Sequence, residues 1–120
     1  MSYYAALRRA EKFYKKLMSI QSSRFDGAWV VFNNIGFKHL IRKARVRSRK
    51  EQIKRFELLK YVPEILKNPD ANVSYRIVIS GYHKVHYWSF REERDGKDIT
   101  VVVRQVGNGI KHFYSVMSKP

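Results

Sequence analysis

The sequence contains no cysteine, so it can form no disulfide, no thiolate zinc site and no cysteine nucleophile. Acidic residues are also scarce, with ten Asp and Glu against twenty-five Lys and Arg and a formal net charge of +15. Charged residues interrupt the N-terminal segment every few positions, and no apolar run reaches membrane length. We therefore expect a chain without a targeting signal that acts in a cytoplasm, either its producer's or that of a cell it has entered.

The 120 residues suffice for one domain, residues 1–120, with a buried core. Hydrophobic residues make up 44% of the chain and aromatic residues 14%, which is too much for a disordered basic tail. The excess positive charge makes nucleic acid the leading partner and an anionic membrane surface the second. The membrane role is disfavoured because no exposed apolar helix face can be identified.

Helical patterns come first along the chain and strand patterns last. Apolar residues at helical spacing predict an N-terminal helix over residues 1–20. Residues 28–70 predict a short strand followed by basic helices, with a capping box at Ser48 and Glu51 and a break at Pro63. Alternating β-branched and aromatic residues predict an antiparallel meander over residues 73–117. This order predicts an α+β fold with helices on one face of the sheet and the other face free.

Positive charge is concentrated between Gly36 and Lys60, where ten basic residues face two acidic ones. Part of this segment forms a dense stripe that would bind a nucleic-acid backbone with an affinity that falls steeply with salt. The residues expected to form this stripe are Arg42, Lys43, Arg45, Arg47, Arg49 and Lys50.

The last hairpin has two open registers, which decide which polar residues meet. A two-residue turn at Asn108-Gly109 pairs Arg104 with Phe113 and segregates a polar face cleanly from an apolar one. A three-residue loop over 107–109 pairs Arg104 with His112 instead and mixes the two sets. We favour the first register, in which His112 and Tyr114 lie on the core face. The polar face then carries Thr100, Val102, Arg104, Lys111, Phe113 and Ser115.

An arginine on the free face of a central strand, with a lysine and a hydroxyl beside it, suits a phosphate group. Arg104, Lys111 and Ser115 provide this set, and an exposed Phe113 or Trp88 would stack a splayed base, although a core position is the favoured interpretation of Trp88. A solvated face without any ligand is the competing interpretation. The basic segment nearby is what favours binding.

The histidines are the remaining candidates for chemistry. His83 and His86 are spaced like metal ligands, but in a strand they point to opposite faces and no carboxylate cluster completes a shell. We therefore predict no metal site and no cofactor. The sequence has no nucleophile elbow, phosphate-cradling glycine loop or carboxylate dyad. An enzyme of this composition would therefore use His, Lys, Arg, Ser and Tyr, the side chains that cleave RNA without metal.

Four segments together resemble a known superfamily. They are Phe37-Lys38-His39, the helix end Val62-Pro63-Glu64-Ile65-Leu66-Lys67-Asn68-Pro69, the strand Lys97 to Gln105, and the strand His112-Phe113-Tyr114-Ser115-Val116. Over roughly residues 28 to 117 the chain resembles the barnase, EndoU, colicin D and RelE superfamily of toxin nucleases, in its compact phage, mobile-element and polymorphic-toxin branch. The resemblance implies N-terminal helices on a curved, mainly four-stranded antiparallel sheet, and RNA cleavage without metal.

The resemblance also implies roles for individual residues. His39 would be the general acid or base, Lys38 and Arg104 would stabilise the phosphorane, and Ser115 would hydrogen-bond a nonbridging oxygen. His112 is typical of the branch, although the favoured register turns it away from Arg104. Cleavage by the 2′-hydroxyl would leave 2′,3′-cyclic phosphate and 5′-hydroxyl ends, with tRNA among the candidate substrates.

Three functions remain open from the sequence. The first is a metal-independent endoribonuclease toxin, from a toxin and antitoxin pair, a mobile element or a delivered effector. The second is a noncatalytic RNA or DNA binding module, and the third is a ribosome-dependent factor that cleaves messenger RNA. A nuclease in its own cytoplasm must be restrained, so an acidic antitoxin or immunity protein is an expected partner, and a ribosome or translation factor is another candidate.

Overall fold

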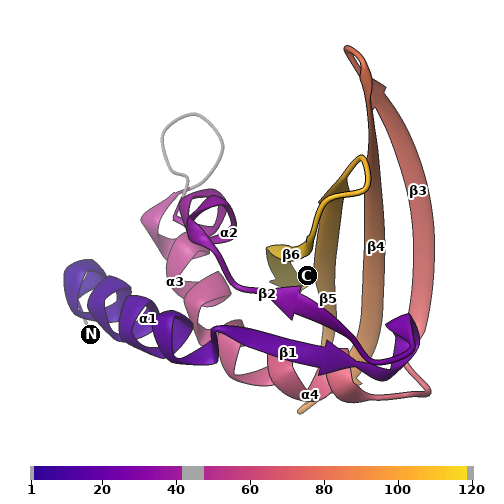
Figure 1. The fold of residues 1–120 in the computed structure, drawn as a ribbon. Coiled ribbons are helices and arrows are strands. Elements are labelled where there is room, and N and C mark those ends of the chain that lie inside the picture. The colour runs from indigo at the N-terminus through magenta and orange to yellow at the C-terminus, as the bar shows by residue number, and fades with distance from the viewer. Residues whose placement is uncertain (1, 42–47, 119–120) are drawn as a thin grey trace.

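A computed structural model describes residues 2–41 and 48–118 of the chain. Helices and two short strands make up the first half, and four long strands fill the second half (Figure 1). The elements are α1 Tyr3–Leu17, β1 Ser19–Ser22, η1 Ser23–Phe25, β2 Ala28–Val31, α2 Asn34–Leu40, α3 Arg49–Leu58, η2 Leu59–Tyr61, α4 Val62–Lys67, β3 Asn72–Ser80, β4 His83–Arg94, β5 Lys97–Val106 and β6 Lys111–Ser118.

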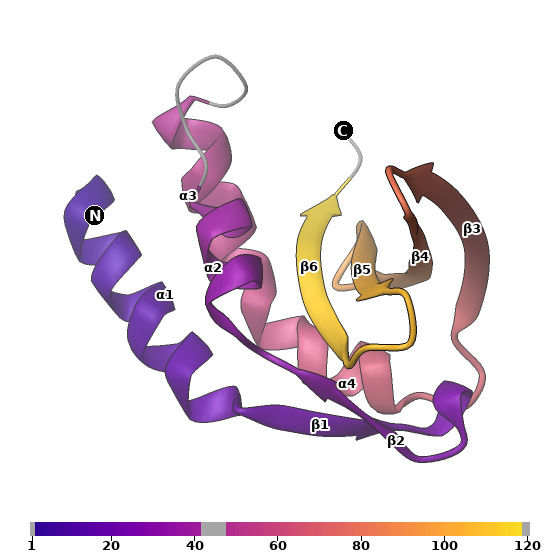
Figure 2. The same cartoon turned by 45° about the horizontal axis from the view of Figure 1, so that its top comes forward.

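The described strands form one six-stranded mixed sheet in the order β1-β2-β6-β5-β4-β3. Strands β3 to β6 pair antiparallel as a meander and are strongly curved (Figure 2). The expectation of a mainly four-stranded antiparallel sheet is therefore incomplete. It missed β1 and the parallel pairing of β2 with β6, which consists of two residue pairs, Val30 with Lys111 and Val31 with His112. The α+β class itself is confirmed.

The N-terminal helix is shorter than its predicted range of 1–20. It ends at Leu17 because Met18 adopts φ 53°, which breaks the helical path, and Ile20 then lies in β1. The helix buries Ala6, Ala10 and Tyr14, so its contact face is built mainly from small residues. Small side chains let α1 pack closely against α3.

The predicted start of the basic helix is confirmed. The Ser48 hydroxyl accepts a hydrogen bond from the Glu51 backbone N–H, which satisfies one of the unpaired donors at the start of α3. The predicted break near Pro63 is also present, since a 3₁₀ turn, η2, separates α3 from α4 and Pro63 lies in the first turn of α4.

The core lies between the helices and one face of the sheet. On that face, strands β4 to β6 contribute Phe90, Ile99, Val101, Val103, Phe113 and Val116, each with 0% exposure. Helix residues Leu40, Val62, Ile65 and Leu66 are buried in the same cluster. Figure 1 shows α2 and α3 beside β6, α1 on the outer side of α3, and β3 at the far edge of the sheet.

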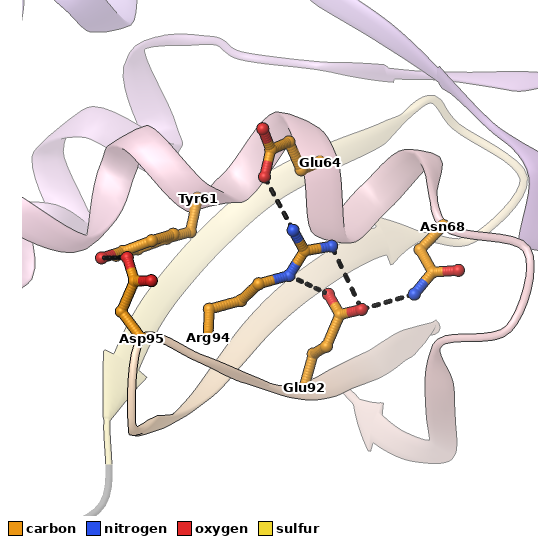
Figure 3. Close-up of polar contacts among 6 residues, drawn as sticks. All are labelled: Tyr61, Glu64, Asn68, Glu92, Arg94 and Asp95. Carbon is orange, nitrogen blue, oxygen red and sulfur yellow. Dashed lines mark hydrogen bonds and ion pairs between the residues drawn. The ribbon is translucent and has the colours of Figure 1, made fainter.

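Several of the scarce acidic side chains fasten the β4–β5 turn to α4 (Figure 3). Arg94 pairs with Glu64 at 2.8 Å and with Glu92 at 3.2 Å, while Asn68 donates a hydrogen bond to Glu92. The Tyr61 hydroxyl donates to Asp95 at 2.6 Å. The bond to Glu92 raises the pKa of Arg94 above its ordinary value, so this guanidinium stays charged at all relevant pH. These carboxylates serve the fold.

Candidate active site

A β-bulge decides which residues of β5 and β6 face each other. The observed pairs are Arg104 with His112, Val103 with Phe113, Val102 with Ser115, Val101 with Val116, Thr100 with Met117 and Ile99 with Ser118. Between the loop and Tyr114, the pairing is the one expected for the three-residue loop. From Ser115 to the end of β6, it is the one expected for the two-residue turn. The favoured pairing of Arg104 with Phe113 is wrong. A bulge inserts one residue into a strand, so the β6 residues between the bulge and the turn point to the opposite face from the one expected.

The corrected register places four polar or aromatic side chains in one line across the sheet. Arg76 of β3 lies opposite Tyr87 of β4, Tyr87 lies opposite Arg104 of β5, and Arg104 lies opposite His112 of β6. Directly opposite residues share a face, so this cross-strand row occupies the face away from the core. The Arg76 guanidinium lies 4.4 Å from the Tyr87 ring centroid. The row alternates cations with rings and ends at an imidazole.

Tyr114 connects this row to the helices. Its ring stacks on His39 at a centroid distance of 4.1 Å, and the Arg104 guanidinium lies over it at 5.3 Å. It also meets the edge of Tyr87 at 5.7 Å and lies 6.5 Å from the His112 ring. Two imidazoles and a guanidinium therefore border one tyrosine ring. The bulge residue, which the favoured register had assigned to the core, is the centre of the candidate site.

The position of His39 depends on how closely α2 approaches β6. The Asn33 side chain caps α2 by accepting a hydrogen bond from the Gly36 N–H. A Cβ atom on Gly36 would lie 2.3 Å from the Phe113 carbonyl oxygen and 2.6 Å from the Tyr14 hydroxyl. Glycine is therefore required for this contact, and His39 follows it by about one helical turn. The sequence Gly36-Phe37-Lys38-His39 carries both the close approach and the imidazole that it positions.

Arg104 and His112 each leave a buried nitrogen without a partner. Neither Nε of Arg104 nor Nε2 of His112 has a hydrogen-bond partner within residues 2–41 and 48–118. Burial, together with the charge of Arg104, lowers the pKa of His112, while a hydrogen bond to the Ile110 backbone opposes this shift. The imidazole is therefore neutral at neutral pH, with Nε2 as an acceptor. A buried donor and a buried acceptor, on neighbouring strands, both lack the group that would satisfy them.

The sequence predicts Ser115 on an open surface, but the structure buries it. It is 3% exposed, and its hydroxyl accepts a hydrogen bond of 3.2 Å from Arg55 of α3. Arg55 also donates to the Val116 carbonyl oxygen and pairs with Glu51 at 3.4 Å. Its side chain is 15% exposed. In this position Ser115 orients the guanidinium of Arg55 and is too buried to contact a substrate directly.

Two residues expected on the binding face lie elsewhere. Phe113 is 0% exposed and stacks on Phe32 in the core, so the expectation that it stacks a nucleobase is wrong. Lys111 lies on the opposite face from Arg104, with its ammonium 5.2 Å from the Phe25 ring and 5.3 Å from the Trp88 ring. Both errors follow from the bulge, because a shift by one residue exchanges the two faces.

The predicted basic stripe is only partly described. Arg42, Lys43, Arg45 and Arg47 lie outside the described residues. Arg49 lies against α1, where its guanidinium is 4.9 Å from the Tyr3 ring and donates to the Tyr4 hydroxyl at 3.3 Å. Lys38 and Lys50 are exposed, on α2 and at the start of α3 respectively.

The described residues contain neither a cluster of metal ligands nor a helix that could span a membrane. Within residues 2–41 and 48–118, no three His, Asp or Glu side chains lie close enough together to hold a metal ion. His83 and His86 both belong to β4 and, three residues apart, point to opposite faces. Among the helices described, none has both the length and the apolarity to cross a lipid bilayer.

Tyr114, Tyr87, Arg76 and Arg55 were missed as site residues in the sequence. Tyr114 was hidden by the bulge, which leaves no local signal here. Arg76 and Tyr87 sit in ordinary alternating strand patterns, and their meeting with Arg104 depends on the registers of two hairpins. The one sequence feature that indicated the observed pairing was the alternative three-residue loop over 107–109, which pairs Arg104 with His112. Gly107 adopts φ 56°, and the Gly109 N–H bonds the Val106 carbonyl, which gives the longer loop.

Comparisons with known proteins give no further guide to this site. No protein-family model matches the chain, and no curated protein or solved structure matches it either. The arrangement of residues is therefore the basis for inferring a function.

Proposed function

We propose that this chain is a metal-independent endoribonuclease whose reaction centre lies between Arg104 and His112. The observation that carries the proposal is the orphaned pair of buried nitrogens, one a donor and one an acceptor, on neighbouring strands. An RNA phosphodiester offers the complement, since a phosphate oxygen accepts from Arg104 and the adjacent 2′-hydroxyl donates to His112. DNA lacks that hydroxyl and would leave His112 Nε2 unsatisfied.

The chemistry follows from these contacts. Neutral His112 takes the proton of the 2′-hydroxyl, whose oxygen forms a bond to phosphorus, and the bond from phosphorus to the 5′-oxygen breaks. Arg104 stabilises the additional negative charge on the phosphorane oxygens. Protonated His39, which stacks on Tyr114, donates a proton to the departing 5′-oxygen. The products are a 2′,3′-cyclic phosphate and a 5′-hydroxyl.

The remaining charges suit substrate binding. Arg76 continues the cross-strand row beyond Tyr87, where it reaches a neighbouring phosphate, and Lys38 is exposed beside His39. The net charge of +15 attracts the polyanion and, in a producing cell, calls for an acidic inhibitor protein over the same surface. The resemblance to the barnase, EndoU, colicin D and RelE superfamily supports the same reaction.

One observation favours the second candidate, a noncatalytic RNA or DNA binding module. His112 is 3% exposed and its Nε2 is covered in the free protein. Catalysis then requires the side chains that cover Nε2 to rotate when the substrate binds. A rotamer change of this kind costs on the order of 1 kcal/mol, which phosphate contacts can offset. A ribosome-dependent nuclease would make the same rotation on its larger partner.

The test is cleavage of total cellular RNA and of purified tRNA in the presence of EDTA. We expect fragments that end in 2′,3′-cyclic phosphate, and no cleavage of a 2′-O-methyl RNA of the same sequence. His112→Asn and His39→Gln should each lower the rate by about 10²- to 10⁴-fold, and Arg104→Gln by about 10²- to 10³-fold.

Matched controls separate the site from general loss of charge. Arg91→Gln removes an exposed arginine of β4 that pairs with Asp98, and His83→Gln removes an exposed histidine at the β3–β4 turn. Both should cut RNA at close to the parent's rate. If His112→Asn and Arg104→Gln also did so, the proposed centre would be misplaced. Tight, salt-sensitive binding without any cleavage of naked RNA would instead support the binding module or the ribosome-dependent nuclease.

A further inference from the structure

A second cluster of rings lies on the other face of the same strands. Tyr75 of β3 lies opposite Trp88 of β4, one position along from the cross-strand row, so the two point to the side of the sheet opposite Arg104. His86 follows the same face of β4. The three rings are stacked or tilted against one another at centroid distances of 5.3 to 5.8 Å. We call Tyr75, His86 and Trp88 the ring platform.

The ring platform is open to solvent although it continues the core face. Tyr75 is 52% exposed, and His86 and Trp88 are partly exposed, because the helices gather beside β6 and leave β3 uncovered. A hydrogen bond of 2.6 Å between the Tyr75 hydroxyl and Nδ1 of His86 fixes the orientation of these two rings. Phe25 of η1 supports Trp88 from the core side at 5.1 Å. The platform is therefore held in place before any ligand arrives.

Two lysines border the platform. The Lys111 ammonium lies 5.3 Å from the Trp88 ring centroid and 5.2 Å from that of Phe25. Lys84 is exposed two residues before His86 and shares its face. Three carboxylates of the described chain, Glu64, Glu92 and Asp95, are engaged in the α4 cluster. The combination of ring faces with flanking cations suits a ligand with flat bases and a negative backbone.

We propose that the ring platform is a second binding site, for single-stranded RNA, on the face of the sheet opposite the reaction centre. Bases stack on Tyr75 and Trp88, and Lys111 contacts a phosphate between them. Stacking depends on ring faces and not on base edges, so the site accepts RNA of any sequence. This binding does not depend on the cleavage proposal.

Trp88 supplies a direct probe of the platform. Trp29→Phe replaces the other tryptophan, which is 55% exposed on β2, and leaves Trp88 as the single emitter of its kind. The ligand is a fluorescein-labelled 2′-O-methyl oligouridylate, which cannot be cleaved by attack of a 2′-hydroxyl. We expect its binding, followed by anisotropy, to quench Trp88 emission with the same midpoint. In this background Tyr75→Ala should weaken binding roughly tenfold or more, and Lys111→Gln should lower the salt dependence by about one ion.

Each variant has a matched control. Tyr82→Ala removes a fully exposed tyrosine at the β3–β4 turn, and Lys16→Gln removes an exposed lysine of α1, so neither should affect Trp88 quenching. Unchanged Trp88 emission at saturation, or equal affinities for Tyr75→Ala and the parent, would overturn the proposal. So would a dimer in sedimentation that Tyr75→Ala dissolves without changing RNA affinity, since the platform would then be an interface between copies. Loss of cleavage in His112→Asn with normal quenching would separate the two sites.

Discussion

Replacing Gly36 with alanine should destabilise the protein and displace the helix that carries His39. The added Cβ would lie 2.3 Å from the Phe113 carbonyl oxygen, 2.6 Å from the Tyr14 hydroxyl and 3.1 Å from the Phe113 ring. The first of these atoms belongs to the backbone of β6, a strand paired on both sides near the loop, and it cannot move alone. The helix α2 must therefore move away from β6.

Two effects of opposite sign set the magnitude. Alanine is better than glycine inside a helix by about 0.5–1 kcal/mol, so without a clash the variant would be more stable. Forcing an atom into a closely packed contact costs about 1–3 kcal/mol. The clash with a backbone atom puts Gly36→Ala at the upper end, so we expect a net loss of about 1–2 kcal/mol. For a chain of this size the melting temperature would fall by about 4–8 °C.

Two measurements test this prediction. Thermal unfolding followed by circular dichroism gives the stability, and Asn34→Ala, an exposed change in the same helix, is the control for helix propensity. Proton NMR reports the stacking of His39 on Tyr114, because ring currents shift the imidazole protons of a ring at 4.1 Å. In Gly36→Ala these shifts should move towards their values in an unfolded chain. They should stay unchanged in Asn34→Ala.

The contact with Tyr14 provides a further check. Tyr14→Phe removes the hydroxyl that the new Cβ would meet, but the Phe113 carbonyl oxygen remains in place. The double variant should therefore stay less stable than Tyr14→Phe alone. A Gly36→Ala protein that melts at or above the parent's temperature, with unshifted His39 resonances, would refute the close approach of α2 and β6 and the positioning of His39 derived from it.

Three further predictions concern stability. The lowered pKa of His112 means that the unfolded chain binds a proton before the folded chain does as pH falls. The free energy of unfolding should therefore decrease as pH falls below the ordinary pKa of 6.5. Urea unfolding at pH values on either side of 6.5 should show this decrease, and His112→Gln should reduce it. Glu92→Gln should cost about 1–2 kcal/mol in urea unfolding by weakening its bonds to Arg94, whereas exposed Glu93→Gln should stay within about 0.5 kcal/mol. Phe113→Ala should cost about 3–5 kcal/mol, and a much smaller loss would contradict its place in the core.

Much of the local structure was predictable because its causes are local. The cap at Ser48, the break near Pro63 and the four long strands follow from side chains within a few residues of each feature. The short strands β1 and β2 were harder. Each has four residues, and β1 was absorbed into the helix prediction because Ile20 continued its apolar spacing. The parallel pairing of β2 with β6 joins segments about eighty positions apart in the sequence, so no local pattern predicts it.

The candidate site was predicted in part. Arg104, His112 and His39 were named from the sequence, and the structure brings all three to one ring. That ring, Tyr114, was assigned to the core. Phe113 was assigned to the surface by the same error of register, and it is fully buried.

The sequence by itself determined the chemistry available to this protein: a large positive charge, no thiol, few carboxylates, and helices followed by strands. These properties depend on composition and on neighbours along the chain. The tertiary structure decided which of those groups meet. A single extra residue at Tyr114 exchanged the two faces of β6 near the loop, and the absence of a Cβ at Gly36 let α2 reach that strand. Both effects arise from long-range packing, in which a shift of one residue reverses the direction of a side chain.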